Sequence, residues 1–152
     1  MLGFLLIIIG LLFIALIIFG SALGFGPSSL STLEKGNKLQ LAFAAEDYSS
    51  ATEYLIDLAE ENPWWTELWE TAGETAYLAG DLLVARGSLE EAQRLGSISL
   101  DGKIRLGEVY NLLGESEKAA QTWEQLEGTA EALEKLAWLH EDNGEISKAI
   151  EV

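Results

Sequence analysis

Residues 66–99 read TELWETAGETAYLAGDLLVARGSLEEAQRLGSIS, and residues 100–129 read LDGKIRLGEVYNLLGESEKAAQTWEQLEGT. Both stretches contain a glycine followed by an acidic residue, with an alanine four positions after the acidic residue. A similar pair of markers occurs four times in the chain: Glu46-Asp47 with Ala51, Gly80-Asp81 with Ala85, Gly114-Glu115 with Ala119, and Gly144-Glu145 with Ala149. The acidic residue and the alanine therefore recur at the same intervals, and the last interval is slightly shorter than the first two. Two independent markers with one period indicate a chain built from repeats.

The segments between the markers have the period of an α-helix. Apolar residues recur three and four positions apart, as in Leu106, Val109 and Leu113, which is typical of amphipathic helices. The two prolines, Pro27 and Pro63, lie outside these segments, and no long alternating β-branched run indicates a strand. The sequence predicts an all-α fold with helices at about 32–45, 48–61, 66–79, 82–95, 100–113, 116–127, 130–143 and 146–152.

The repeating unit resembles the tetratricopeptide repeat. That family carries Trp, Leu-Gly and Tyr on the first helix of each pair, and Ala and an aromatic residue on the second. The third unit has Leu106-Gly107, Tyr110, Ala119 and Trp123, and the other units match in part. The resemblance implies an α-solenoid of about 3.5 helix hairpins over 32–152, with units at about 32–65, 66–99, 100–129 and 130–152, the last one incomplete.

Small and large residues of the repeat have complementary expected roles. Gly73 and Gly107 would let the two helices of a pair approach closely, while Leu89 and Trp123 would fill the space between units. Stacked units then share one continuous core, because a single unit cannot bury its apolar face. Gly87 departs from this pattern, since a glycine inside a helix costs about 1 kcal/mol relative to alanine.

The first 26 residues differ in amino-acid composition from the rest of the chain. From Leu2 to Leu23 they are apolar apart from three glycines and Ser21, and about 20 such residues can span a bilayer as a helix. We therefore predict a single transmembrane helix at 1–26 and a linker at 27–31. A cleaved signal peptide and a helix buried in a filament are the alternatives.

Glycines and lysines refine this prediction. Spacings of small residues suited to packing against another membrane helix are present at Gly3, Gly10, Gly20 and Gly24. Lys35 and Lys38 follow the apolar segment and no basic residue precedes it. The excess of positive charge on cytoplasmic flanks then places the C-terminal domain in the cytoplasm.

Charge and composition exclude several classes of function. The chain has 9 basic and 25 acidic residues, a net charge of −16, and all of these charges follow residue 33. Such a protein is unsuited to nucleic acid, whose phosphates require Lys and Arg. With no cysteine, one histidine and no catalytic motif, the sequence predicts a protein that is not an enzyme and that uses no metal or other cofactor.

The resemblance also implies a binding surface, because the first helices of this family line a concave groove. The corresponding residues here are Phe43, Glu67, Glu70, Glu74, Tyr77, Glu108, Asn111, Trp138 and Glu141. Three of them, Glu67, Glu70 and Glu74, lie on one helix face. Charge complementarity then favours a protein partner with a basic segment, and the alternative is a solvated acidic face without a ligand.

Two adjacent tryptophans stand apart from the repeat pattern. Trp64 and Trp65 follow Pro63 at an expected turn, where both cannot face the same core. They are candidate interface anchors, because tryptophan is enriched among residues that dominate binding energy. Burial in the solenoid and contact with a membrane surface are the alternatives.

These inferences lead to a membrane-anchored scaffold that holds a protein partner at the bilayer. Such a protein would act as an assembly factor or as an accessory subunit of a membrane protein complex. The alternatives are a structural subunit of a homo-oligomer or filament whose apolar helices pack together, and the N-terminal part of a longer chain.

Overall fold

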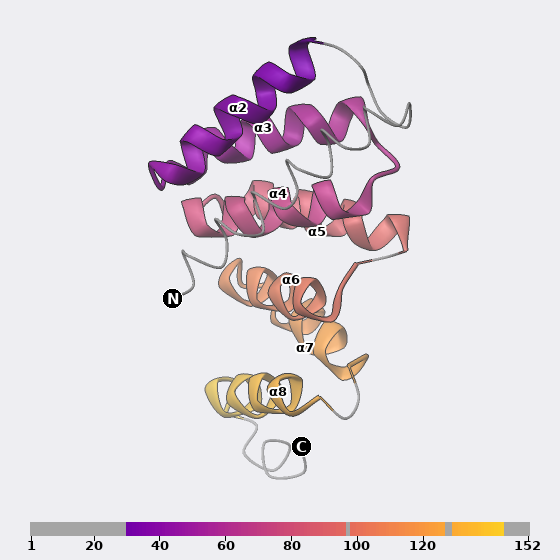
Figure 1. The fold of residues 1–152 in the computed structure, drawn as a ribbon. Coiled ribbons are helices and arrows are strands. Elements are labelled where there is room, and N and C mark those ends of the chain that lie inside the picture. The colour runs from indigo at the N-terminus through magenta and orange to yellow at the C-terminus, as the bar shows by residue number, and fades with distance from the viewer. Residues whose placement is uncertain (1–29, 97, 127–128, 145–152) are drawn as a thin grey trace.

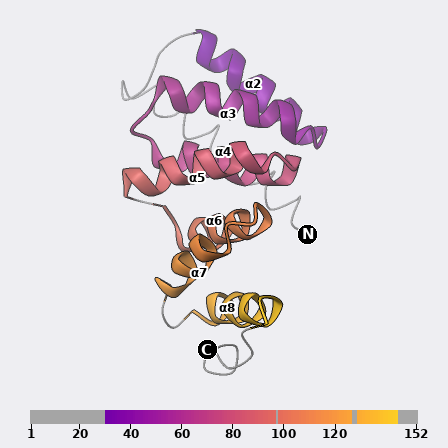
Figure 2. The ribbon, with the colours of Figure 1, turned by 180° about the vertical axis from the view of Figure 1, so that it is seen from behind.

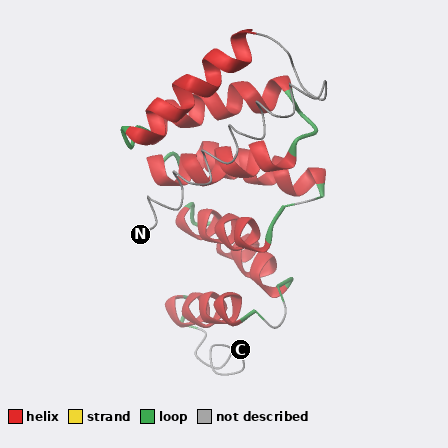
Figure 3. Ribbon diagram, viewed as in Figure 1, coloured by secondary structure: helices red, strands yellow, loops and turns green. Residues whose placement is uncertain are grey.

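The computed structural model describes residues 30–96, 98–126 and 129–144 (Figure 1). These residues form helices joined by short turns, and no strand occurs among them (Figure 3). The helices are α2 (Leu30–Ala44), α3 (Tyr48–Glu61), α4 (Thr66–Ala79), α5 (Leu82–Leu95), α6 (Leu100–Leu112), α7 (Ser116–Glu124) and α8 (Ala130–Asp142). The expected bounds agree at both ends for α3, α4 and α5, whereas α7 ends at Glu124, before its expected end.

Some predictions concern residues outside the described part of the chain. They are the membrane helix at 1–26 with Gly3, Gly10, Gly20 and Gly24, and the final helix at 146–152. The linker prediction is partly wrong, because α2 already begins at Leu30. Among the described helices, none has the length and apolar character that a bilayer crossing requires.

The helices are stacked as successive antiparallel hairpins. α2 pairs with α3, α4 with α5, and α6 with α7, and α8 begins the next layer (Figures 1 and 2). Each helix packs against the next one in sequence, and α4 also contacts α6. The all-α solenoid expected from the repeats is therefore confirmed for the described residues.

The repeating turn within each hairpin has a common backbone structure. Glu46, Gly80 and Gly114 each adopt a positive φ, of 56°, 81° and 77°. The next residue then donates its backbone N–H to a carbonyl five positions earlier, as Asp81 does to Ala76 at 3.0 Å. This hydrogen bond satisfies a carbonyl at the end of the first helix. The recurring acidic marker is thus the signal that ends one helix and starts the next.

Two glycines permit close packing inside the hairpins. A Cβ atom at Gly73 would lie 2.5 Å from Cγ of Leu89, and one at Gly107 would overlap the indole ring of Trp123. The Trp123 indole is buried and donates its Nε1–H to the carbonyl of Ile104 at 3.2 Å. The role predicted for the two glycines is confirmed, whereas Leu89 and Trp123, expected to fill the space between units, pack against the glycine of their own hairpin.

The buried side chains form two clusters that meet in α4. One joins α2, α3 and the first half of α4, and the other joins the end of α4 to α5, α6, α7 and α8. Leu68 and Ala72 belong to the first cluster, whereas Ala76 belongs to the second. α4 therefore couples the first hairpin to the rest of the solenoid.

Candidate functional site

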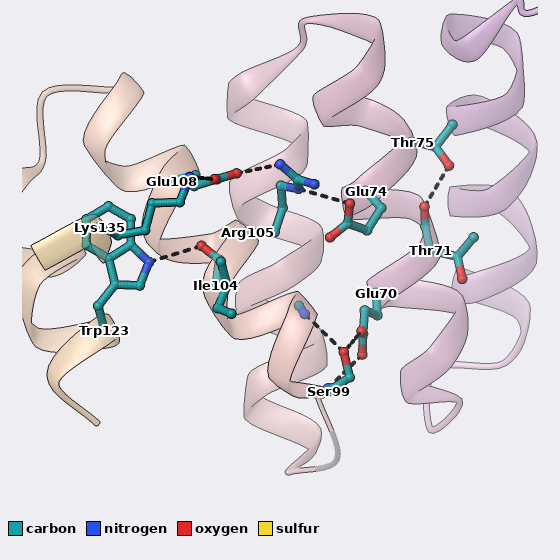
Figure 4. Close-up of polar contacts among 11 residues, drawn as sticks. Glu70, Thr71, Glu74, Thr75, Ser99, Ile104, Arg105, Glu108, Trp123 and Lys135 are labelled. Carbon is teal, nitrogen blue, oxygen red and sulfur yellow. Dashed lines mark hydrogen bonds and ion pairs between the residues drawn. The ribbon is translucent and has the colours of Figure 1, made fainter. Parts of the chain in front are cut away.

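The side chains of α4, α6 and α8 form one surface, called here the first-helix face. Along it, Glu74 of α4 pairs with Arg105 of α6 at 3.0 Å, and Glu108 of α6 pairs with Lys135 of α8 (Figure 4). The two glutamates occupy equivalent positions of successive units, and so do the two basic residues. The salt bridge therefore repeats with the fold.

Arg105 connects the two pairs into a single ladder. Its guanidinium contacts Glu74 through Nε and Glu108 through Nη1 (Figure 4). It also stacks on the ring of Tyr77, at 4.2 Å from the ring centroid. Lys135 completes the ladder on the other side of Glu108. Two positive charges thus balance two negative charges on the central part of the first-helix face.

The electrostatic environment differs along the ladder. Burial raises the pKa of Glu74, and the nearby Arg105 opposes that rise. At the other end, the hydrogen bond to Glu108 raises the pKa of Lys135. Because hydrogen bonds to charged groups are the stronger ones in proteins, the ladder holds α4, α6 and α8 together rather than offering free charge.

A third carboxylate of the predicted acidic stripe also has an internal partner. Glu70 of α4 accepts hydrogen bonds from the backbone N–H of Ser99, at 2.9 Å, and from its hydroxyl group (Figure 4). Ser99 is the N-cap of α6, and its hydroxyl oxygen accepts from the backbone N–H of Gly102. Glu70 therefore fixes the start of α6 against α4.

A groove opens on the first-helix face next to the ladder. Its volume is about 630 Å³, and its lining includes Tyr77 of α4, Leu112 of α6 and Trp138 of α8. Leu112 is 56% exposed and Trp138 is 51% exposed. Apolar surface of this extent at the side of a concave site is typical of ligand recognition.

A substitution within the repeat explains where the groove lies. Tyr77 and Asn111 occupy equivalent positions of successive units. At the α4–α6 junction the Tyr77 ring underlies Arg105. At the α6–α8 junction the smaller Asn111 takes that place and lines the groove. The groove therefore lies at the junction where the repeat has a short amide in place of the aromatic ring, and Tyr77 also contributes to its lining.

Two acidic residues at the groove remain available to interact with a partner. Glu131 and Glu134 of α8 line it, are exposed, and make no ion pair with another described residue. They lie three positions apart, so they are close together on the helix. The groove thus combines an apolar floor with an acidic border.

The other predicted groove residues have different environments. Phe43 is only 7% exposed and belongs to the core shared by α2, α3 and α4, so its assignment to the groove is wrong. It occupies the position equivalent to Tyr77, but apolar packing has closed the first junction around it. Glu67 and Glu141 are exposed and do not line the groove.

The structure also separates the two adjacent tryptophans. Trp65 is half-buried against the first core cluster, whereas Trp64 is 73% exposed. Only Trp64 retains the exposure that an interface anchor requires, and Trp65 supports the packing of the first two units.

The acidic-groove hypothesis needs correction, because Glu70 and Glu74 do not line the groove, whereas Glu108 does. Glu70, Glu74 and Glu108 hold neighbouring helices together, so replacing them with lysine would disrupt the fold as well as any binding. A sequence signal for the ladder does exist, because a basic residue, Arg105 or Lys135, follows the acidic one at nearly the interval of the repeat. We did not predict Arg105, Lys135, Leu112 or Glu131 as site residues.

Within the described part of the chain, no cluster of three His, Cys, Asp or Glu side chains is arranged to hold a metal ion. The first-helix face instead offers a mixed apolar and acidic surface.

Comparison with known proteins supports the fold. The sequence matches no family model and no curated protein. The structure is similar to the crystal structure of MamA, a protein that contains tetratricopeptide repeats, with a TM-score of 0.54 and 16% sequence identity. The similarity covers 79% of this chain and 86% of MamA. The chain therefore has a TPR-like solenoid fold.

Proposed function

We propose that this protein is an interaction scaffold whose groove between α6 and α8 holds a segment of a partner protein. The observation that carries the proposal is the open groove with the exposed side chains of Leu112 and Trp138 beside the two available acidic residues of α8. The solenoid positions all of them on rigid helices, so little conformational entropy is lost when a partner binds.

The chemistry of the groove specifies the segment. An apolar side chain of the partner would lie against Trp138 and Leu112, and a basic side chain would lie near Glu131 and Glu134. Charge complementarity of this kind favours the correct partner and its rate of association. The partner thus keeps the basic character expected from the sequence, but the carboxylates that meet it are those on α8.

The apolar segment 1–26 supports a second part of the proposal. As a transmembrane helix it would tether the solenoid to a bilayer, with the C-terminal domain in the cytoplasm. Tethering raises the local concentration of a partner in the same membrane and strengthens weak binding. The protein would then act as an assembly factor or accessory subunit of a membrane protein complex, and a homo-oligomer is the alternative.

Photo-crosslinking in intact membranes tests the groove. A photoreactive amino acid at Leu112 should give a defined crosslinked protein, whereas the same amino acid at Gln121 should not, because Gln121 is an exposed residue of α7 outside the groove lining. Trp138→Ala should weaken capture about 30-fold, since a central tryptophan commonly contributes about 2 kcal/mol to binding.

Circular dichroism provides the control, because Trp138 is half-exposed and its replacement should leave helicity unchanged. Equal crosslinking from both positions, or capture that is unaffected by Trp138→Ala, would contradict binding in the groove. A crosslinked product consisting of two copies of this chain would favour the homo-oligomer.

A further inference from the structure

The start of α2 and the loops between units lie along one edge of the solenoid. In the stack, the α3–α4 and α5–α6 loops lie on the same side as the first residues of α2 (Figures 1 and 2). Lys35 in the second turn of α2 pairs with Glu61 at the end of α3 at 2.7 Å, and also with Asp57 at 3.3 Å. The beginning of α2 is thus fixed beside the α3–α4 loop.

The α3–α4 loop is firmly held and presents one large side chain. Asn62 is buried and donates its side-chain N–H to the carbonyl of Leu58 at 2.9 Å. Trp65 is half-buried against the core, and its backbone N–H donates to the carbonyl of Asn62 at 2.9 Å. Between them lies Trp64, the most exposed large hydrophobic residue in the described part of the chain.

The second loop extends the same edge. Glu70, in the second turn of α4, accepts from Ser99 just before α6. This contact brings the α5–α6 loop against the beginning of α4, and Leu100 at the start of α6 is exposed. Two exposed apolar side chains, Trp64 and Leu100, therefore belong to the edge from which α2 begins.

The sequence that precedes α2 limits how far this edge can lie from a bilayer. The apolar run ends at Leu23, and only the short stretch 24–29 separates it from Leu30. A stretch of that length spans at most about 20 Å. If the apolar run crosses a membrane, the start of α2 and the neighbouring loops are held close to the lipid surface.

We propose that this edge docks on the membrane surface, with Trp64 inserted among the lipid headgroups. Tryptophan prefers that interface because its ring is apolar and its indole N–H can still reach polar groups. The inference rests on the membrane anchor of the proposed function. It adds an orientation, in which the solenoid rests on the bilayer by one edge.

The charges at this edge indicate which kind of lipid it would contact. Glu60, Glu67 and Asp101 are exposed and lie near the two loops. These carboxylates would be repelled by an anionic surface. The edge is therefore suited to zwitterionic lipid such as phosphatidylcholine.

Site-specific fluorescence on the full chain tests this orientation, because the chain has no cysteine of its own. Glu60→Cys places a fluorophore in the last turn of α3, four positions before Trp64, and Leu83→Cys places it at the opposite edge, at an exposed residue of α5. In phosphatidylcholine vesicles, a quencher attached to the lipid headgroup should reduce emission at position 60 several-fold more than at position 83.

Adding Trp64→Glu to the Glu60→Cys protein should lower its quenching to the level of position 83. Helicity should not change, because the Trp64 side chain is 73% exposed. Equal quenching at both positions, or quenching unaffected by Trp64→Glu, would overturn the docking. Flotation with the vesicles is measured in parallel. A chain that does not float would contradict the membrane anchor, and the docking with it, whereas a floating chain without edge-specific quenching contradicts the docking alone.

Discussion

The two junctions of the first-helix face use the same pattern of residues and reach different outcomes. Between α4 and α6, Glu74 pairs with Arg105, and Tyr77 lies under the guanidinium. Between α6 and α8, Glu108 pairs with Lys135, and Asn111 occupies the position of the tyrosine. The groove lies at the second junction, and Tyr77 of the first junction contributes to its lining. The repeat therefore keeps its ion pair at a junction where the neighbouring side chain has changed in size.

The length of the second helix differs between the same two units. α5 has 14 residues and α7 has 9, which corresponds to the shorter interval between the last two markers in the sequence. The groove thus lies where the repeat is least regular. Units that depart from the repeat pattern are candidates for functional sites, because stacking alone requires only the regular pattern.

The largest expected effect comes from the glycines beneath the two junctions. Gly107→Ala should destabilise the protein by about 2 kcal/mol, because the new methyl group overlaps the buried ring of Trp123. Gly73→Ala should cost about 1 kcal/mol, since Leu89 can change its rotamer more easily than an indole can move. Chemical denaturation measures both values.

Gly87 provides the matched control. Nothing lies within 4 Å of a Cβ atom at this helical position, so Gly87→Ala should stabilise the protein by about 1 kcal/mol. Because Trp123 lines the groove, Gly107→Ala should also impair partner capture, whereas Gly73→Ala should not. A larger loss of stability for Gly73→Ala than for Gly107→Ala would contradict the packing described here.

The ion pairs should differ in a second, smaller way. Arg105→Ala removes the partner of Glu74 and one of the two partners of Glu108, and we expect a loss of about 1.5 kcal/mol in the free energy of unfolding. Lys135→Ala removes only one contact at the more open junction, and its cost should remain below about 1 kcal/mol. Denaturation at low and high salt measures the difference, and equal costs would show that the junctions are not distinct.

The smallest expected effect concerns the turn of the first hairpin, which lies away from both junctions. Glu46 has a φ of 56° where the next two hairpins have glycine. Glu46→Gly should stabilise the protein by about 1 kcal/mol, because a left-handed backbone is strained for residues with a Cβ atom. Thermal unfolding measures this gain.

Binding at the groove should be unaffected by Glu46→Gly, which separates stability from recognition. The reverse change, Gly80→Ala, provides the control, since it imposes the same strain on a second turn with φ of 81°. A destabilising effect of Glu46→Gly would mean that the glutamate side chain contributes more than its backbone strain costs.

Much of the fold could be predicted from the sequence because its signals are local. Apolar periodicity indicates helices, and the recurring turn marks where each helix ends. The close approach of paired helices at Gly73 and Gly107 was also predictable, since a residue without a side chain leaves room for its neighbour. That Leu89 and Trp123 fill this room inside the same hairpin was not predicted. The start of α2 at Leu30 was missed, because Ser28, Ser29, Ser31 and Thr32 are all suitable N-cap residues and the sequence does not select among them.

The candidate site was predictable only in part. The predicted residues that line the groove are Tyr77, Glu108, Asn111 and Trp138, whereas Phe43, at the position equivalent to Tyr77, is buried. The position of a residue in a repeat determines which neighbour it faces. Whether that neighbour covers it depends on the side chains of the next unit, which lie far away in the sequence.

The sequence by itself determined that this chain forms helix hairpins at regular intervals and carries strong negative charge after residue 33. These properties depend on contacts between near neighbours and on composition. Only the tertiary structure decided which carboxylates are neutralised and which remain available. Glu74 and Glu108 become internal because Arg105 and Lys135 reach across from the next helix, whereas Glu131 and Glu134 line the groove and remain exposed.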